Sequence, residues 1–266
     1  MMLVQTETGP QFLMQLNNRY LNTDELSIHV FMNGFSFCTK SKISFFDFKS
    51  NELNTKTLKN WIKLKNISFS KNKLIIFNHQ AAIIPKMLFD KNKTDQYLNT
   101  TLKLKKEIVK YDVLDQTEQV VVYCINNSEL KILSEIYPSL KTKHFITILL
   151  EKLSIFSKGN STKMMYINLR ENFFDLFIYQ GTQLLFYNSF EQKNEEDFMY
   201  YLFYVADIQH LKPGDFKMFF LGKFPFFNNY YSSIKDYHDE IHFINKELIL
   251  ENMKSHKVPF FSNIFT

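Results

Sequence analysis

The 266-residue chain contains few glycines and no cluster of them. A loop that binds phosphate through its backbone amides needs clustered glycines, because a Cβ would hold the amides away from the oxygen atoms. The chain accordingly has no GxGxxG, no GxxxxGK[ST] and no GxSxG motif. This argues against dinucleotide-binding, P-loop and α/β-hydrolase proteins. The six glycines are Gly9, Gly34, Gly159, Gly181, Gly214 and Gly222.

Cysteine and arginine are also scarce. Cys38 and Cys124 are the two cysteines and form no CxxC, so the sequence offers neither a disulfide framework nor a zinc cluster, which indicates a reducing cytoplasm. The net charge is +5, but only Arg19 and Arg170 are arginines. Lysine is a poorer residue than arginine for bidentate recognition of phosphate and guanine. We therefore do not expect nucleic-acid binding.

Long apolar runs are missing as well. The longest uncharged run, from Leu176 to Phe190, has 15 residues, whereas a membrane-spanning helix needs about 18. The first residues lack a basic start followed by an apolar block, so no secretory signal is expected. These features predict a cytoplasmic protein without a membrane span.

Alternating apolar residues begin the first half of the chain. Residues 26–32 and 35–38 alternate on either side of Asn33-Gly34, which is the strongest short signal for a hairpin because both residues tolerate positive φ. A third strand at 43–48, an amphipathic helix at 55–64 and a short apolar strand at 73–77 are predicted to follow.

The middle of the chain has weaker patterns. A helix is predicted at 95–104, and a hairpin between 108–114 and 119–125. Asn127 and Ser128 are the cap candidates of a helix that ends at Tyr137. A strand end followed by a buried helix is predicted over 142–156, and Lys158-Gly159-Asn160-Ser161 is the best candidate linker.

The opening pattern then returns. Three strands are predicted at 163–169, 173–179 and 183–189, with Asn194 as the N-cap of the next helix. A strand at 216–221, a short helix at 230–237 and a strand at 240–244 complete the pattern. The order strand-strand-strand-helix-strand therefore occurs twice.

This duplicated order resembles the actin-like (ribonuclease H-like) ATPase fold, which actin, Hsp70, sugar kinases, and cell-division and pilus-assembly proteins share. The segments Tyr187-Asn188-Ser189-Phe190 and 196–201 also resemble an uncharacterised bacterial family, a domain of unknown function suspected of belonging to the actin-like group. The resemblance implies an α/β protein with two lobes, each a mixed sheet flanked by helices. The expected division is a loose N-terminal segment (1–24), a first lobe (25–157, with an insertion near 80–125) and a second lobe (158–266).

Active members of the actin-like group hold nucleotide between three loops that carry carboxylates and glycines. In this chain, Asn33 stands where the first loop has a carboxylate, Arg170 where the second has a glycine, and Lys223 where the third has a second glycine. The resemblance thus implies a non-catalytic protein with degenerate nucleotide loops, acting as a protein-binding or scaffolding module for an unidentified protein partner. No catalytic residue, metal or cofactor is predicted.

Two alternatives stay open. One is an RNA-associated ribonuclease H-like protein, which predicts a continuous lysine surface and salt-dependent binding. The other is an ATP-binding phosphotransferase or ATPase with atypical phosphate loops. It would place ATP and Mg among Asn33, Gly34, Ser36, Asn168, Glu171 and Gly222.

Three further features have ordinary explanations. The segment His238-Asp239-Glu240-Ile241-His242 lacks the HExxH order and alternates like a strand, so we expect two exposed histidines and no metal. Lys56, Lys59 and Lys63 are expected to form a solvated helix face, with docking to an acidic partner or an anionic membrane surface as the alternative. The aromatic residues of 258–265 are expected to dock on the body or on a partner.

Overall fold

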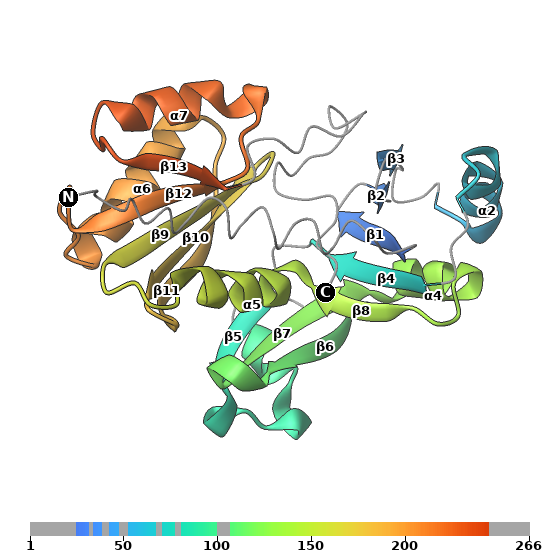
Figure 1. Cartoon of the computed structure of the whole chain (residues 1–266). Helices are drawn as coiled ribbons and strands as arrows, with labels where there is room; N and C mark the ends of the chain where they lie inside the picture. The colour runs from blue at the N-terminus through green and yellow to red at the C-terminus, as the bar shows by residue number, and fades with distance from the viewer. Residues whose placement is uncertain are drawn as a thin grey trace, which may run out of the picture.

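The computed structural model describes residues 25–31, 34–38, 43–47, 53–67, 71–77, 81–99 and 107–244 (Figure 1). The sequence predictions for 1–24, Asn33 and 258–265 lie outside these residues. The described part forms three sheets with helices packed around them. None of the described helices has the length and apolar character needed to cross a membrane.

The first sheet has the strand order β3-β2-β1-β4-β8. β1 pairs antiparallel with β2 and parallel with β4, and its last residue, Phe31, pairs with Gly34, the first of β2. The predicted hairpin is present, but its turn was predicted one residue too late, because Gly34 of the expected Asn33-Gly34 turn already belongs to β2. The strands are β1 (Glu25–Phe31), β2 (Gly34–Cys38), β3 (Ile43–Asp47), β4 (Lys71–Ile76) and β8 (Lys141–His144).

The second sheet repeats this arrangement with the order β11-β10-β9-β12-β13. Its first strand, β9, again pairs antiparallel with the second and parallel with the fourth. The identical order and directions confirm the predicted duplicated α/β fold. The strands are β9 (Lys163–Leu169), β10 (Phe173–Gln180), β11 (Gln183–Glu191), β12 (Phe216–Leu221) and β13 (Ile241–Ile244).

A third sheet is inserted in the sequence between β4 and β8 of the first sheet and has the order β5-β7-β6. It consists of β5 (Ala81–Pro85), β6 (Glu107–Leu114) and β7 (Gln119–Asn126), and the short helix η3 (Asp115–Thr117) joins β6 to β7. The predicted hairpin is therefore present. The helix expected at 95–104 has one described turn, α3 (Gln96–Asn99), and residues 100–104 lie outside the description.

The longer helices begin at side-chain caps. Asn194 Oδ1 accepts a hydrogen bond from Asp197 N at 2.9 Å, as predicted. The cap predicted at Asn127 or Ser128 is wrong by one residue, because β7 runs directly into α4 and its last residue, Asn126, accepts from Ser128 N at 3.0 Å. The helices are α2 (Thr55–Leu64), α4 (Asn127–Ile136), α5 (Phe145–Ser157), α6 (Glu195–Ile208) and α7 (Asn228–Lys235).

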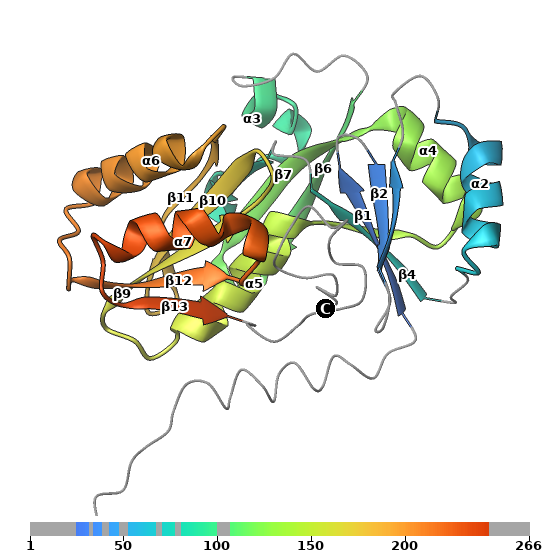
Figure 2. The same ribbon diagram turned by 90° about the horizontal axis from the view of Figure 1, so that it is seen from above.

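Helix α5 joins the two lobes, which we define as the first and the second sheet with their helices. Its first six residues are all buried, whereas Glu151 and Lys152 are half-buried and Ile155 is exposed. Leu150 and Leu153 share one core with Met164 and Tyr166 of the second sheet, and Ser157 Oγ lies 2.8 Å from Tyr166 Oη. Figures 1 and 2 show α5 on one side of the second sheet, with α6 and α7 on the other. The lobes are thus connected by a continuous apolar core.

Candidate functional site

The parallel strands of the two sheets end in the same region between the lobes. β4 and β8 of the first sheet point toward the second lobe, and β12 and β13 point back toward the first (Figure 1). In open α/β sheets, ligands bind outside the carboxyl ends of the strands. We call the residues that follow these strand ends, together with Phe31 at the end of β1 and Arg170 after the end of β9, the carboxyl edge. It is the candidate site.

On the first lobe, three stacked phenylalanines occupy the carboxyl edge. Phe31 ends β1, Phe77 follows β4, and Phe145 follows β8. The ring centroids of Phe31 and Phe77 lie 5.0 Å apart, and those of Phe77 and Phe145 lie 4.9 Å apart with an interplanar angle of 6°. All three rings are buried. This aromatic stack presents ring faces at the place where a phosphate would require N–H donors.

On the second lobe, the guanidinium of Arg170 continues the stack. Its Cζ atom lies 5.0 Å from the ring centroid of Phe145 and 5.3 Å from that of Phe173. Arg170 Nε donates to Asp175 Oδ2 at 2.9 Å, and Nη2 donates to Asp175 Oδ1 at 2.8 Å and to Ser189 Oγ at 2.9 Å. Arg170 is 6% exposed and Asp175 is fully buried. The arginine is therefore engaged in a buried bidentate ion pair and a cation–π contact.

The β9–β10 hairpin positions this ion pair. Asn168 lies opposite Asp175 in the ladder, and its Nδ2 donates to Asp175 Oδ2 at 2.8 Å. The hairpin turn is closed by Arg170 N, which donates to Phe173 O at 2.8 Å. Burial raises the pKa of the neighbouring Tyr187 hydroxyl well above its usual value; the charge of Asp175 adds to this effect and that of Arg170 opposes it. These hydrogen bonds all lie within the second lobe, and Asn168 Oδ1 is buried without a partner among the described residues.

The glycines of the other two predicted loops also have structural roles. The N–H of Gly222 donates to Ile244 O at 2.8 Å, and the residue has φ +85°. A Cβ on Gly34 would lie 2.6 Å from Phe45 Cζ and even closer to the carbonyl oxygen of Phe46. Gly34 therefore permits the close approach of β3. Both glycines serve contacts within the chain.

The remaining predicted residues do not form one cluster with these glycines. Ser36 is fully buried in β2 opposite His29, and its hydroxyl has no hydrogen-bond partner among the described residues. Glu171 is exposed at the hairpin turn. The structure brings Asn168 together with Asp175, a residue that was not predicted. A carboxylate in the middle of the apolar run of β10 was the signal for it, because a buried charge requires a partner.

The N-terminus of α5 lies at the carboxyl edge and is capped from within the chain. Asp112 Oδ2, from β6, accepts from His144 N at 2.8 Å and from Thr147 Oγ1 at 2.7 Å. Tyr123 Oη donates to Asp112 Oδ1 at 3.1 Å. Burial raises the pKa of the Asp112 carboxyl, although these three hydrogen bonds lower it. A helix N-terminus attracts anions, and here the chain supplies its own carboxyl group.

A cysteine–histidine contact is also present. Cys38 Sγ lies 3.9 Å from His29 Nδ1, and His29 Nε2 lies 2.8 Å from Ser27 Oγ. Burial raises the pKa of the Cys38 thiol far above its ordinary value. The thiolate is the nucleophilic form, so burial disfavours reactivity at Cys38.

The histidine pair of the last strand differs from its prediction. His238 was expected to be exposed, but it is 6% exposed, and its Nε2 lies 3.2 Å from Phe216 O. The prediction is wrong for His238, because its ring packs at 4.6 Å against that of Phe216, under the end of α7. His242 is exposed, as predicted. Within the described ranges, no group of three or more His, Cys, Asp or Glu side chains is placed to hold a metal ion.

The repeated sheets and the interlobe carboxyl edge define an actin-like ATPase fold, and solved structures support this assignment. A Bacteroides thetaiotaomicron VPI-5482 protein with an actin-like ATPase fold and unknown function is 25% identical, with a TM-score of 0.70 over 83% of this chain and 90% of that chain. The PilM–PilN type IV pilus biogenesis complex matches at 8% identity, with a TM-score of 0.52 over 84% of this chain and 88% of that chain.

The chain belongs to the DUF3822 family of proteins of unknown function, whose family description matches residues 15–241. This confirms the resemblance to an uncharacterised family related to actin-like ATPases. No curated protein matches the chain.

Proposed function

We propose that this chain is a non-catalytic actin-like protein that acts as a protein-binding or scaffolding module in the cytoplasm. One observation carries the proposal: the aromatic stack and the Arg170–Asp175 pair occupy the carboxyl edge. Groups that would contact a nucleotide in an active member here contact each other. The two buried free cysteines fit a reducing compartment.

The ATP-binding alternative has weaker support. It requires free backbone amides and carboxylates at the loops, but the amide of Gly222 donates to Ile244 O, and Asn168 bonds to Asp175. Glu171 lies at the exposed turn. Among the described members of this set, the Ser36 hydroxyl and Asn168 Oδ1 are buried without a hydrogen-bond partner, and both residues lie within strands.

A protein partner is the finer part of the proposal. The similar fold of PilM is seen in a complex with PilN, and we propose that this chain likewise binds protein. Nucleic acid is disfavoured, because the sole arginine of the described residues is buried in an ion pair. The exposed face of α2 carries Lys56, Lys59 and Lys63, and lysine lacks the planar fork that arginine uses for bidentate recognition. Binding to single-stranded RNA should therefore be absent at both 50 and 200 mM salt, as checked by fluorescence anisotropy.

The deciding experiment is calorimetric titration of the full chain with ATP and Mg²⁺, together with a thermal-shift assay. We expect neither heat of binding nor a shift in Tm. A ligand present at a hundred times its Kd would stabilise the fold by about 2.7 kcal/mol, which is easily detected. The control is Arg170→Gly, which restores the glycine expected at the second loop and should not create binding. Micromolar affinity with release of phosphate would refute the proposal.

A further inference from the structure

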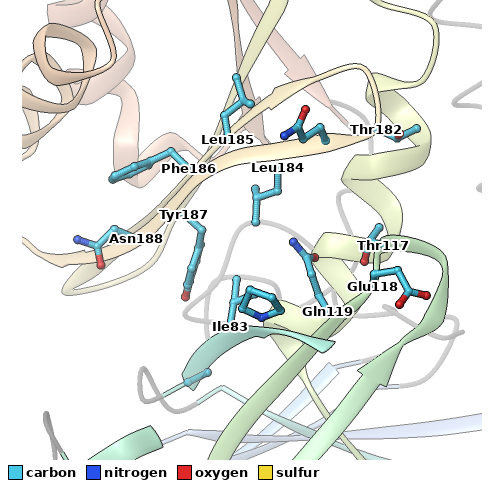
Figure 3. Close-up of a pocket in the computed structure, with 13 residues that line it drawn as sticks. Ile83, Thr117, Glu118, Gln119, Thr182, Leu184, Leu185, Phe186, Tyr187 and Asn188 are labelled. Atoms are coloured by element: carbon cyan, nitrogen blue, oxygen red, sulfur yellow. The ribbon is translucent and has the colours of Figure 1, made fainter. Parts of the chain in front are cut away.

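A groove with a volume of about 590 Å³ lies between β11 of the second lobe and the third sheet (Figure 3). One wall is formed by the consecutive residues 182–188, and the other by β5 and residues 117–119. We call it the edge groove. It is separate from the residues of the aromatic stack, none of which line it.

The backbone of β11 is exposed to the edge groove. Successive side chains of a strand point to opposite faces of its sheet. The side chains of one face cannot account for seven consecutive lining residues, so the feature that these residues share is the edge of their backbone. β11 is the terminal strand of the second sheet, and β5 is the terminal strand of the third. The outer edge of each is therefore without a strand partner in the described part of the chain. An unpaired edge of this kind is a template for another strand.

The side chains of the groove are apolar or neutral with one exception, Glu118. From β5, the alternate residues Ala81, Ile83 and Pro85 line the groove, so this strand presents one apolar face to it. Figure 3 shows Leu184 pointing from β11 toward this wall. The lining contains no lysine or arginine. A phosphorylated or otherwise anionic ligand is therefore disfavoured, and an uncharged one is favoured.

A β-bulge shapes the β11 wall. The register between β10 and β11 shifts at Ile178 and Tyr179, so that Leu185 has no opposite residue. As a result, Leu184 and Tyr187 both point toward the third sheet (Figure 3) and pack against the core that contains Ile83. The apolar wall of β5 thus faces apolar side chains of β11.

We propose that the edge groove binds an extended, uncharged peptide segment of a protein partner, which adds to β11 as a further strand. This rests on the proposed function as a protein-binding module and names the site and the ligand class. The chemistry of the two walls indicates the class of occupant. The unpaired backbone edge of β11 can pair with the backbone of another strand, and an apolar wall with one carboxylate disfavours an acidic segment. The six lining residues that belong to β11, 183–188, span about 20 Å, enough to pair with about six residues of the peptide.

The first experiment selects peptides from a random 12-residue phage-display library on the full-length protein. Enriched sequences should be free of acidic residues and should alternate apolar side chains with a period of two. Enrichment of acidic sequences, of sequences with helical periodicity, or of none would overturn the proposal.

The second experiment locates the binding. Ile83→Lys places a charge in the β5 wall, and the selected peptide should bind at least about tenfold more weakly in fluorescence anisotropy. Ile208→Lys makes the same change in an isoleucine of α6 that is 47% exposed and does not line the groove, and it should leave affinity unchanged. Equal losses in both variants, with both folded by circular dichroism, would overturn the assignment.

Backbone pairing is tested by N-methylating the peptide one amide at a time. Strand addition predicts losses of about three- to tenfold at every second amide, each corresponding to one lost hydrogen bond, and no loss between them. Uniform tolerance would show that side chains alone are recognised, and would refute strand addition.

Two other occupants are outcomes of the same assays. If a synthetic peptide of residues 258–265 binds wild type and not Ile83→Lys, and outcompetes the selected peptides, the site serves this chain's own segment. If Ile83→Lys instead dissociates a dimer in sedimentation, it serves a second copy. Either result overturns the partner proposal. Nucleotide turnover would refute the non-catalytic function and would leave the peptide results valid. A failed peptide selection would refute the groove proposal and would leave the argument from the carboxyl edge valid.

Discussion

Arg170 donates two hydrogen bonds to Asp175, from Nε to Oδ2 at 2.9 Å and from Nη2 to Oδ1 at 2.8 Å, and both side chains are buried. The pair lies where the second lobe meets Phe145 of α5. A guanidinium at this position would bind phosphate well, but here a carboxylate of the same hairpin neutralises it. The pair therefore connects the turn between β9 and β10 to the packing between the lobes.

Removing one partner of this pair should be strongly destabilising. Asp175→Ala leaves the Arg170 charge buried without its counterion, and we expect a loss of about 3–5 kcal/mol in the free energy of unfolding. The double variant Arg170→Met with Asp175→Leu should recover most of that loss, because an apolar pair requires no counterion. Urea unfolding of wild type, Arg170→Met, Asp175→Leu and the double variant measures the coupling.

The exposed ion pair between Lys86 and Asp115 provides the control. Its N–O distance is also 2.8 Å, but the side chains are 40% and 80% exposed. Asp115→Ala should change the free energy of unfolding by less than about 1 kcal/mol. A loss at Asp175 as small as the one at Asp115 would show that the buried pair does not stabilise the hairpin.

Much of the fold is predictable because its signals are local. The strands of the second sheet begin and end within two residues of their predicted bounds, since each alternates in hydrophobicity and is bounded by a turn residue such as Gly181. The cap at Asn126 was missed, because a strand that continues directly into a helix has no separate turn signal. The third sheet was visible only as its hairpin, since β5 pairs with β7 over a separation of more than thirty residues.

The candidate site was predictable only in part. The three loops follow strand ends that periodicity locates, so their positions are correct. The contact of Arg170 with Phe145 depends on how α5 packs between the lobes, and no periodic pattern encodes it. The edge groove was not predicted for the same reason: its walls, β5 and β11, are about a hundred residues apart and meet only in the tertiary structure.

Gly34 should be intolerant of even the smallest side chain. An alanine Cβ would collide with the carbonyl oxygen of Phe46 and with the ring of Phe45, so β3 must move. We expect Gly34→Ala to cost about 3 kcal/mol, at the upper end for overpacking. In Gly159→Ala the added Cβ has no atom within 4 Å, and the φ of +82° is the only source of strain. We therefore expect a loss of about 1–2 kcal/mol in the free energy of unfolding. Similar losses in urea unfolding would contradict the close-approach role of Gly34.

The pH dependence of stability should include a contribution from Glu129. Burial raises the pKa of its carboxyl from 4.5 to about 7. Between these values the folded protein retains a proton that the unfolded chain loses, so this contribution falls as pH rises from about 4.5 to 7. The slope is at most about 1.4 kcal/mol per pH unit.

Glu129→Gln should remove this slope, because the amide does not ionise. The test is the free energy of unfolding at pH 5 and pH 7.5, where the variant should lose less than the wild type. Glu196→Gln makes the same change in an exposed glutamate of the first turn of α6 and should keep the wild-type slope. Parallel pH profiles for wild type and Glu129→Gln would show that this carboxyl does not titrate as its burial implies.

Phe145→Ala distinguishes two reasons why the carboxyl edge would not hold a nucleotide. Phe145 is 1% exposed and lies between Phe77 and the Arg170 guanidinium. Its loss should cost about 3–5 kcal/mol and leave a cavity. If the ring merely blocks the site, ATP and Mg²⁺ should bind to the variant. We expect no binding, because the cavity lies between the ring of Phe77 and a guanidinium whose charge Asp175 already neutralises.

A cavity between an aromatic ring and a guanidinium face instead suits an uncharged aromatic guest. Benzene should therefore raise the Tm of Phe145→Ala and leave that of the wild type unchanged, whereas ATP with Mg²⁺ should shift neither. Phe226→Ala, which truncates a ring that is 72% exposed, controls for the loss of an aromatic side chain and should respond to neither ligand. If nucleotide stabilised Phe145→Ala alone, the loops would still recognise phosphate, and the Phe145 ring would be what keeps nucleotide out of the wild type.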